Sequence, residues 1–473
     1  MKIIKFLIPI LFLIFGLFIF SYPMFFNANS MPGTLEDNRF INYVLEHGYN
    51  WIIQTKTHES FWNMPMFYPN KNTLAYSDIL LGGMIIYTPI RFIIKNPQSA
   101  FQLFYIIVCS LNFITFFYLA KKIFKLDNLY SSFAAFFFSF CLPRSAQTQH
   151  IQLFIQFYMV LSIFFFASIN EKYSKLKNKF LFLLGIIFFL VQIYTTFYFG
   201  WYMLFSLPIA IVSMLIFKNS REAFKNWFKN IDKNYIYLII IGLIGLMPLC
   251  WHYLLVGSKF AKAEPSSWTH LFFSQSQFDL FFVDLTYFYF PEAILGIGFL
   301  TTILLISAIF KSKYKWTIIL FAAIVIMTFC NDFIYSKFYD YFLPAAAIRA
   351  LGRYVFILIP IWAIVLANYL KNTKSIVATL IMMFLIMLEQ IPYVNHFDWN
   401  KTQHNTRIEK YTSNKDCEVI SFEFKKDKEF YINNIDAIWY ANNKNKYTTN
   451  GYSGFIPIID NSFLDKKCII TSK

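Results

Sequence analysis

Long apolar stretches recur along almost the whole chain and are separated by short polar connections. A helix needs about 20 apolar residues to cross the hydrocarbon core of a bilayer, although tilted or partly buried spans vary in length. The pattern therefore predicts an all-α polytopic membrane protein with about 11 transmembrane helices. The candidate spans are 5–26, 99–120, 129–143, 151–169, 180–198, 200–217, 235–255, 291–310, 315–331, 354–370 and 374–392.

One further apolar stretch, residues 79–95, decides the topology and is interrupted by two glycines and a proline. Counting it as a span would move every later connection to the opposite side. Without it, all the short lysine-rich connections share a side with Lys2 and Lys5, as the positive-inside rule requires. We therefore predict that residues 79–95 form a re-entrant or surface-lying helix on the outer face, and that the N-terminus is cytoplasmic. The connections in question are 121–125, 172–179, 218–233, 311–315 and 371–374.

The long polar segments then all face outward: 27–98, 256–290, 331–353 and the tail. We predict a transmembrane domain over residues 1–394, with outer juxtamembrane helices in its first loop, 27–98. Residues 395–473 are predicted to form a small extracytoplasmic C-terminal α/β domain.

The tail alternates strand-like runs at 418–424 and 455–459 with turn residues, and 432–441 has a helical pattern. Cys417 and Cys468 lie in this tail, and an exported location would allow them to form a disulfide. The sequence leaves open whether they are bridged.

Composition supports a lipid environment, because 57% of residues are hydrophobic, 21% aromatic and only 14% charged. The formal net charge of +16 comes largely from basic clusters between apolar stretches. Such clusters are topology signals and contacts to anionic lipids, so membrane lipids are expected partners and nucleic acid is not. The predicted location is the bacterial inner or plasma membrane.

The first outer segment carries two adjacent carboxylates, Glu36 and Asp37, shortly after the first predicted span. An amphipathic helical pattern follows through Phe40, Val44 and Ile52. A carboxylate at this place suits a general base or a ligand of a divalent cation such as Mg²⁺ or Mn²⁺, with Asp37 the metal candidate. The alternative is that the pair only favours the N-terminus of the helix.

The same segment contains His58, Trp62 and Asp78, with further aromatic residues between them. Aromatic rings stack on sugars, and short polar side chains bind hydroxyl groups, so these residues are candidates for substrate binding. Trp and Tyr also form the ordinary aromatic belt at a membrane interface, which is the alternative for any one ring.

Two further outer clusters carry cations. Arg144 and His150 lie in CLPRSAQTQHIQ at 141–152, and Arg349 and Arg353 lie in FLPAAAIRALGRYVF at 342–356. Guanidinium groups suit a lipid-linked phosphate, and residues four apart share one helix face. The alternatives are an interfacial arginine with a hydrogen-bonded histidine for the first cluster, and arginine anchors to lipid head groups for the second.

The position of Asp37 after the first span, the outer juxtamembrane helices and the many further spans resemble the GT-C superfamily of integral membrane glycosyltransferases. Two segments are more specifically similar to YfhO-type and related bacterial membrane proteins: FWNMPMFYPNKNTLAYSD at 61–78 and IDAIWYANNKNKYTTNGYSGFIP at 435–457.

The resemblance implies an inverting enzyme that moves a sugar from a polyprenyl-phosphate carrier to a glycan, lipid or other acceptor at the extracytoplasmic face. Asp37 would match the first-loop acidic residue that acts as base or metal ligand, with Glu36 as the rival carboxylate. Arg349 and Arg353 would lie where the carrier phosphate is held. A WWDYG-like tail motif is absent from the sequence, so asparagine-linked transfer to protein is disfavoured. The rival functions are a flippase for a lipid-linked glycan and a non-catalytic assembly factor.

Overall fold

Each apolar stretch that the sequence marks as a candidate span contains a helix. The computed structural model describes residues 2–257, 296–329, 350–392, 397–411, 417–425, 427–453 and 467–470, with Ile334, Tyr335, Lys337, Tyr341, Ile348 and Pro457 between them. The helices of the bundle are α1 Lys2–Phe26, α4 Pro97–Lys122, α5 Asn128–Phe140, α7 Phe157–Ala167, α8 Lys175–Thr195, α9 Phe197–Ile216, α11 Tyr235–Gly257, α14 Phe299–Lys311, α15 Lys315–Phe329, α18 Val355–Lys371 and α19 Ile376–Glu389.

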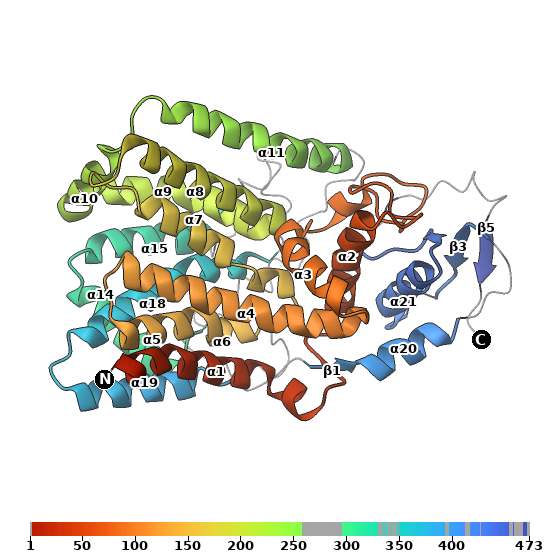
Figure 1. Ribbon diagram of the computed structural model, residues 1–473, viewed down its shortest axis with the longest axis horizontal. Helices are drawn as coiled ribbons and strands as arrows, with labels where there is room; N and C mark the ends of the chain where they lie inside the picture. The colour runs from red at the N-terminus through yellow and green to blue at the C-terminus, as the bar shows by residue number, and fades with distance from the viewer. Residues whose placement is uncertain are drawn as a thin grey trace.

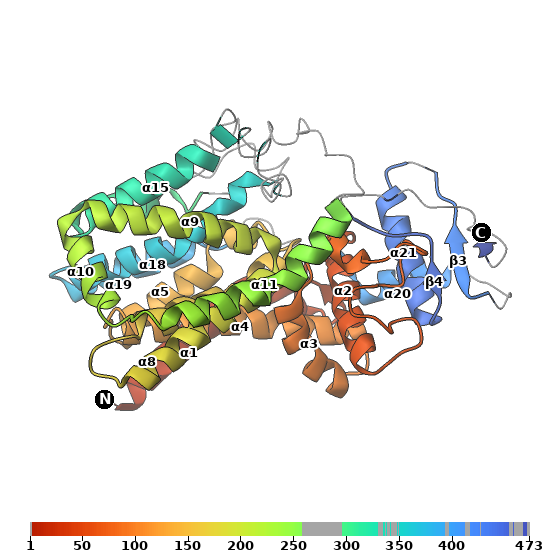
Figure 2. The ribbon, with the colours of Figure 1, turned by 90° about the horizontal axis from the view of Figure 1, so that it is seen from above.

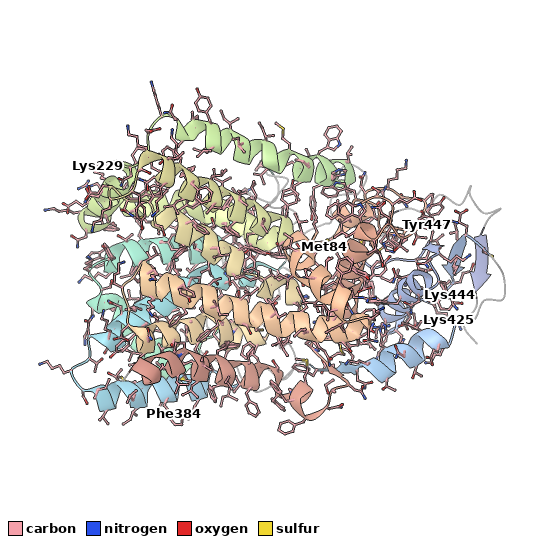
Figure 3. All side chains as sticks on the ribbon, in the orientation of Figure 1. Met84, Lys229, Phe384, Lys425, Lys444 and Tyr447 are labelled. Carbon is pink, nitrogen blue, oxygen red and sulfur yellow. The ribbon has the colours of Figure 1, made fainter. Side chains whose placement is uncertain are left out.

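Among the described residues, six helical segments are long and apolar enough to cross a membrane: Leu7–Phe26, Pro97–Lys122, Lys175–Thr195, Phe197–Ile216, Tyr235–Gly257 and Leu351–Lys371. The helices also expose large apolar side chains, such as Leu243 and Met247 on α11 and Phe384 on α19 (Figure 3). A surface of this kind is suited to lipid rather than water. The chain is therefore a multi-pass helical membrane protein, and the count of about 11 spans stays a prediction.

The lysine-rich connections gather at one end of the bundle, with the N-terminus and helix α10, Lys218–Phe228 (Figure 1). Lys371 Nζ lies 3.2 Å from the carbonyl oxygen of Lys125, and the side chain of Asn219 donates to the carbonyl oxygen of Lys313 at 3.0 Å. These contacts join connections that are far apart in sequence. These connections therefore lie at one end of the bundle, while their sharing one side of the membrane, and that side being the cytoplasmic one, stay predictions.

The opposite end of the bundle carries α2 Asp37–Ile52 and α3 Leu81–Ile93 (Figure 2). Helix α3 has 13 residues, about 20 Å of helix, which is short of the ~30 Å hydrocarbon core. Helix α2 follows the predicted amphipathic pattern, but residues Asn38 to Gly48 are all buried. Its polar face is covered because the C-terminal region packs on it. Short helical turns connect these parts: η1 Thr73–Tyr76, α6 Leu142–Ser145, η2 Ile151–Phe154 and η5 Leu351–Tyr354.

The C-terminal region contains helices and a small parallel sheet, as the alternating pattern of the tail predicts. The sheet has the strand order β4-β3-β5, and both outer strands run parallel to β3. The expected strand at 455–459 lies mostly outside the described residues, and the domain boundary at 394 stays a prediction. The elements are β2 Trp399–Asn400, α20 Lys401–Glu409, β3 Val419–Phe422, α21 Phe430–Asn443, β4 Tyr447–Thr448 and β5 Lys467–Ile470. Cys417 is in a disulfide, which the sequence would pair with Cys468, whose side chain lies outside the described residues.

The first outer segment and the C-terminal region are joined by backbone and by apolar contacts. Strand β1, Ser30–Met31, pairs antiparallel with β2. The indole nitrogen of Trp439 donates to the carbonyl oxygen of Arg39 at 3.0 Å, and its ring packs edge-on against Tyr43. Both aromatic residues belong to the same apolar core as the helices of the bundle. Packing therefore fixes α21 beside α2, at the end of the molecule where the candidate site residues lie.

Candidate functional site

The candidate site is built around the first turn of α2. Glu36 occupies the position before the helix and Asp37 is its first residue. A carboxylate is favourable there because the unpaired backbone N–H groups of a helix start carry partial positive charge. The side chain of Asp37 is 30% exposed, so it is reachable from outside the protein. The first turn of α2 thus places a partly exposed carboxyl group at the start of a mostly buried helix.

His150 is brought to Asp37 from a distant part of the chain. Its Nδ1 lies 3.4 Å from Oδ2 of Asp37. The segment that carries His150 is tied to α2, because the side-chain amide of Asn38 donates to the carbonyl oxygen of Thr148 at 3.0 Å. Two residues that the sequence analysis proposed separately are thereby in contact.

The other oxygen of Asp37 has a partner from the C-terminal region. The hydroxyl group of Tyr452 donates a short hydrogen bond to Oδ1. Sequence reasoning missed this tyrosine as a site residue. It lies within the 435–457 segment that carried the resemblance to YfhO-type proteins, but nothing in its spacing indicated that it would meet Asp37.

Asp78, from the first outer segment, contacts the start of α9. One of its carboxylate oxygens accepts the backbone N–H of Phe197 at 2.7 Å. Burial raises the pKa of the Asp78 carboxyl, while this hydrogen bond and the positive potential of Arg353 and His150 act in the opposite direction. Asp78 is therefore electrostatically linked to two of the other proposed residues.

Arg353 belongs to η5 and is largely buried, with 8% exposure. Its Nε donates to Oε1 of Gln147 at 3.2 Å, and its guanidinium carbon lies 4.7 Å from the centre of the Tyr198 ring. Gln147 comes from the His150 segment and Tyr198 from the start of α9. These two positioning contacts were not predicted. Arg349, the other arginine of the pair, lies outside the described residues.

Glu36 differs from Asp37 in its electrostatic environment. Burial raises the pKa of the Glu36 carboxyl, and the neighbouring charge of Asp37 raises it further. Since the raised pKa disfavours the charged form, Glu36 is the weaker candidate for a permanently ionised acceptor.

Arg144, a predicted substrate-binding residue, has its contacts inside the protein. Arg144 is fully buried, and its guanidinium group donates to the carbonyl oxygens of Phe138 and Leu153 and to the side chain of Gln156. Burial of an arginine without an acidic partner is costly, so these acceptors account for its position. Arg144 is thus enclosed within the protein, and its role in substrate binding stays a prediction.

His58 and Trp62 lie farther along the first outer segment. His58 is buried, with Nδ1 2.8 Å from Nδ1 of His47 and Nε2 3.0 Å from the side-chain oxygen of Asn442. Trp62 is partly buried and stacks on the ring of His252, with ring centres 3.7 Å apart. Their role in binding substrate stays a prediction, because no contact joins them to Asp37.

A divalent cation has no ready set of ligands in the described part of the chain. Among these residues no group of three or more His, Cys, Asp or Glu side chains is placed to hold a metal ion. Around Asp37 the described partners are a tyrosine hydroxyl and one histidine. Metal binding at Asp37 therefore stays a prediction.

No protein-family model matches this sequence, and no curated protein matches it. Solved structures do match. The oligosaccharyltransferase of Archaeoglobus fulgidus in complex with Zn and sulfate aligns with a TM-score of 0.51 at 10% identity, covering 94% of this chain and 62% of that one. The chain shares the fold of this enzyme.

The Archaeoglobus fulgidus oligosaccharyltransferase AglB, in complex with an inhibitory peptide and a dolichol-phosphate, aligns with a TM-score of 0.50 at 10% identity, covering 95% of this chain and 64% of that one. ArnT from Cupriavidus metallidurans bound to undecaprenyl phosphate aligns with a TM-score of 0.47 at 13% identity, covering 80% of this chain and 63% of that one. Both proteins are members of the GT-C superfamily. The chain spans less than two thirds of the length of each, and the finer likeness to YfhO-type proteins stays a prediction.

Proposed function

We propose that this chain transfers a sugar from a polyprenyl-phosphate-linked donor to a glycan, lipid or other acceptor at the extracytoplasmic face of the membrane. The observation that carries the proposal is the contact between Asp37 and His150, 3.4 Å apart at the bundle end opposite the lysine-rich connections. A partly exposed carboxylate with a histidine beside it suits removal of a proton from an acceptor hydroxyl.

In the proposed reaction, the acceptor oxygen attacks the anomeric carbon of the donor sugar while Asp37 takes the hydroxyl proton. A new glycosidic bond forms, and the bond between the anomeric carbon and the phosphate oxygen breaks, with the electron pair leaving on the phosphate. Attack from the side opposite the phosphate inverts the anomeric centre. No redox partner is needed.

Arg353 is proposed to stabilise the negative charge that develops on the departing lipid phosphate, together with Arg349. Electrostatic stabilisation of this kind is strongest where the donors are held in place before the reaction. Gln147 and Tyr198 hold the Arg353 guanidinium group from two sides. If a cation such as Mg²⁺ or Mn²⁺ is used, Asp37 would be the residue that holds it, and it would supply positive charge for the donor phosphate; removal with a chelator tests its presence.

The fold comparison supports this proposal. The oligosaccharyltransferase that shares the fold was solved with a dolichol-phosphate, which is a polyprenyl-type phosphate carrier. We further propose the bacterial inner or plasma membrane as the location, with a cytoplasmic N-terminus and an extracytoplasmic C-terminus. The end that carries Asp37 then faces the compartment where lipid-linked sugars are used. Asparagine-linked transfer remains disfavoured by the absence of a WWDYG-like motif in the sequence.

The test is release of free polyprenyl phosphate from a labelled polyprenyl-phosphate sugar by the purified full-length protein in lipid nanodiscs. The wild-type protein should release the carrier only when an acceptor mixture is present, and Asp37→Asn should abolish the release. Donor movement across the bilayer without release would favour a flippase. The absence of both release and movement would favour an assembly factor. Either of these two outcomes would refute the proposal.

A further inference from the structure

We propose that Tyr452 is a positioning residue for Asp37, so that the segment Asn450 to Ser453 of the C-terminal region forms part of the reaction site. The inference rests on the proposed function for its catalytic meaning. Its structural basis is that each oxygen of the Asp37 carboxylate has its own partner: the Tyr452 hydroxyl on Oδ1 and His150 Nδ1 on Oδ2.

Asn450 anchors the segment on the C-terminal sheet. Its side-chain oxygen accepts the backbone N–H of Phe422 at 2.8 Å, and its amide donates to the carbonyl oxygen of Phe422 and to Asn434, both at 3.0 Å. These bonds use both ends of one amide group, so the chain that leaves strand β4 is tied to Phe422 at the end of β3. Tyr452 follows two residues later.

The residues on either side of Tyr452 are held by the first outer segment. A Cβ atom at Gly451 would lie 2.5 Å from the ring of Phe67, so only glycine allows this close approach. The backbone N–H of Phe67 donates to the carbonyl oxygen of Asn450 at 3.0 Å, and the Ser453 hydroxyl donates to the carbonyl oxygen of Tyr76 at 2.7 Å.

The tyrosine ring is also fixed, with its centre 5.1 Å from that of Phe40, one turn along α2 from Asp37. Burial and the adjacent Asp37 carboxylate hold the pKa of Tyr452 well above its usual range. The hydroxyl therefore keeps its proton and acts as a donor to Asp37. A donor on Oδ1 fixes the orientation of the carboxylate and leaves Oδ2, on the His150 side, available to take the acceptor proton.

The other described ionisable groups that act on the pair of Asp37 and Tyr452 are Glu36, His150 and Tyr431. Replacing Tyr452 by phenylalanine removes the hydroxyl that donates to Asp37 and keeps the ring. Tyr452→Phe is therefore the informative variant. Tyr431→Phe is the matched control, because the Tyr431 ring packs edge-on against Tyr452 and its side chain is half exposed.

The decisive measurement is the rate of Asp37 modification by a water-soluble carbodiimide with an amine at one fixed pH, read by mass spectrometry on the full-length protein in nanodiscs. The exposure of Asp37 permits the reaction. Tyr452→Phe should raise the labelling rate roughly tenfold, because the hydrogen bond that occupies Oδ1 is lost. Tyr431→Phe should leave the rate unchanged.

Equal labelling rates in the wild type and Tyr452→Phe would overturn the proposal, whether or not the protein proves to be a transferase. If Tyr452→Phe does not fold, Ser453→Ala provides the second test, because it loosens the anchor and keeps the Tyr452 hydroxyl. It should raise the labelling rate as well, and an unchanged rate would overturn the proposal.

The activity assay adds a separate readout. Tyr452→Phe should lower kcat roughly tenfold with little change in the donor KM. An active wild type, an inactive Asp37→Asn and an unchanged Tyr452→Phe would refute the positioning role alone. A wild type without transfer would refute the proposed function, while the labelling result would still decide whether Tyr452 controls Asp37.

Discussion

Arg39 and Asp436 form a fully buried ion pair, with Nη2 of the arginine 2.6 Å from Oδ1 of the aspartate. Arg39 lies in the first turn of α2, two residues after Asp37, and Asp436 lies in α21. The other carboxylate oxygen of Asp436 accepts Nε of Arg407 at 2.8 Å. One carboxylate thus joins the helix that begins at the candidate base to two elements of the C-terminal region.

Asp436→Asn should destabilise the protein by about 3–5 kcal/mol, because it leaves a buried guanidinium group without its compensating charge. The measurement is thermal unfolding followed by tryptophan fluorescence, since Trp439 lies in the same interface. Glu429→Gln is the matched control, because it removes the other acidic partner of Arg407. The Glu429 side chain is 59% exposed, and surface ion pairs contribute about 0–1 kcal/mol. Equal effects of the two variants would contradict the interpretation.

The buried pair His47 and His58 should make the protein less stable in acid. Burial lowers the pKa of His47 to about 4, and burial together with His47 lowers that of His58. Burial of the two rings disfavours their charged forms in the native protein, whereas histidine in an unfolded chain takes up a proton near pH 6.5. Between these values the unfolded state binds more protons, so stability falls as pH falls, by about 3 kcal/mol for His47 on reaching pH 4.

The check is the thermal midpoint of the wild type and of the double variant His47→Gln/His58→Gln from pH 8 to pH 4. The double variant should start lower, because the bonds to Phe61 and Asn442 are altered, but should fall less steeply. Parallel curves would show that the acid sensitivity comes from other groups.

Glu36→Gln should retain transfer within about threefold of the wild type, in contrast to Asp37→Asn. It should also raise the thermal midpoint slightly at pH 7 to 8, because the raised pKa of Glu36 means that its charged form is disfavoured in the folded protein. The gain should disappear below the usual pKa of glutamate, where the side chain is protonated in both states. Loss of activity in Glu36→Gln with retention in Asp37→Asn would reverse the assignment of the base.

Cysteines introduced one at a time, as Lys229→Cys and Lys444→Cys, should be labelled from opposite sides of the membrane. Both side chains are exposed, and they lie at opposite ends of the molecule (Figure 3). With Cys250 replaced by alanine, a membrane-impermeant maleimide added to intact cells should label Lys444→Cys and not Lys229→Cys, with labelling of both after lysis as the control. The reverse pattern would invert the proposed topology and move Asp37 to the cytoplasmic side.

The sequence determined the helices and their grouping, because these depend on local pattern. Every predicted apolar stretch contains a helix, and the Phe40, Val44 and Ile52 pattern marks α2. The lysine positions also indicated that the connections lie together at one end of the bundle, because moving a lysine side chain across lipid costs free energy.

Only the tertiary structure decided which polar residues meet. The sequence could name Asp37 and His150 but not join them, and it gave no reason to bring Tyr452 to Asp37 across 415 positions of chain. It also could not distinguish Arg144, whose charge is met by internal carbonyl and amide oxygens, from an arginine open to a ligand. Helices and sidedness follow from each residue's preference for lipid or water, whereas these contacts depend on how distant segments pack against one another.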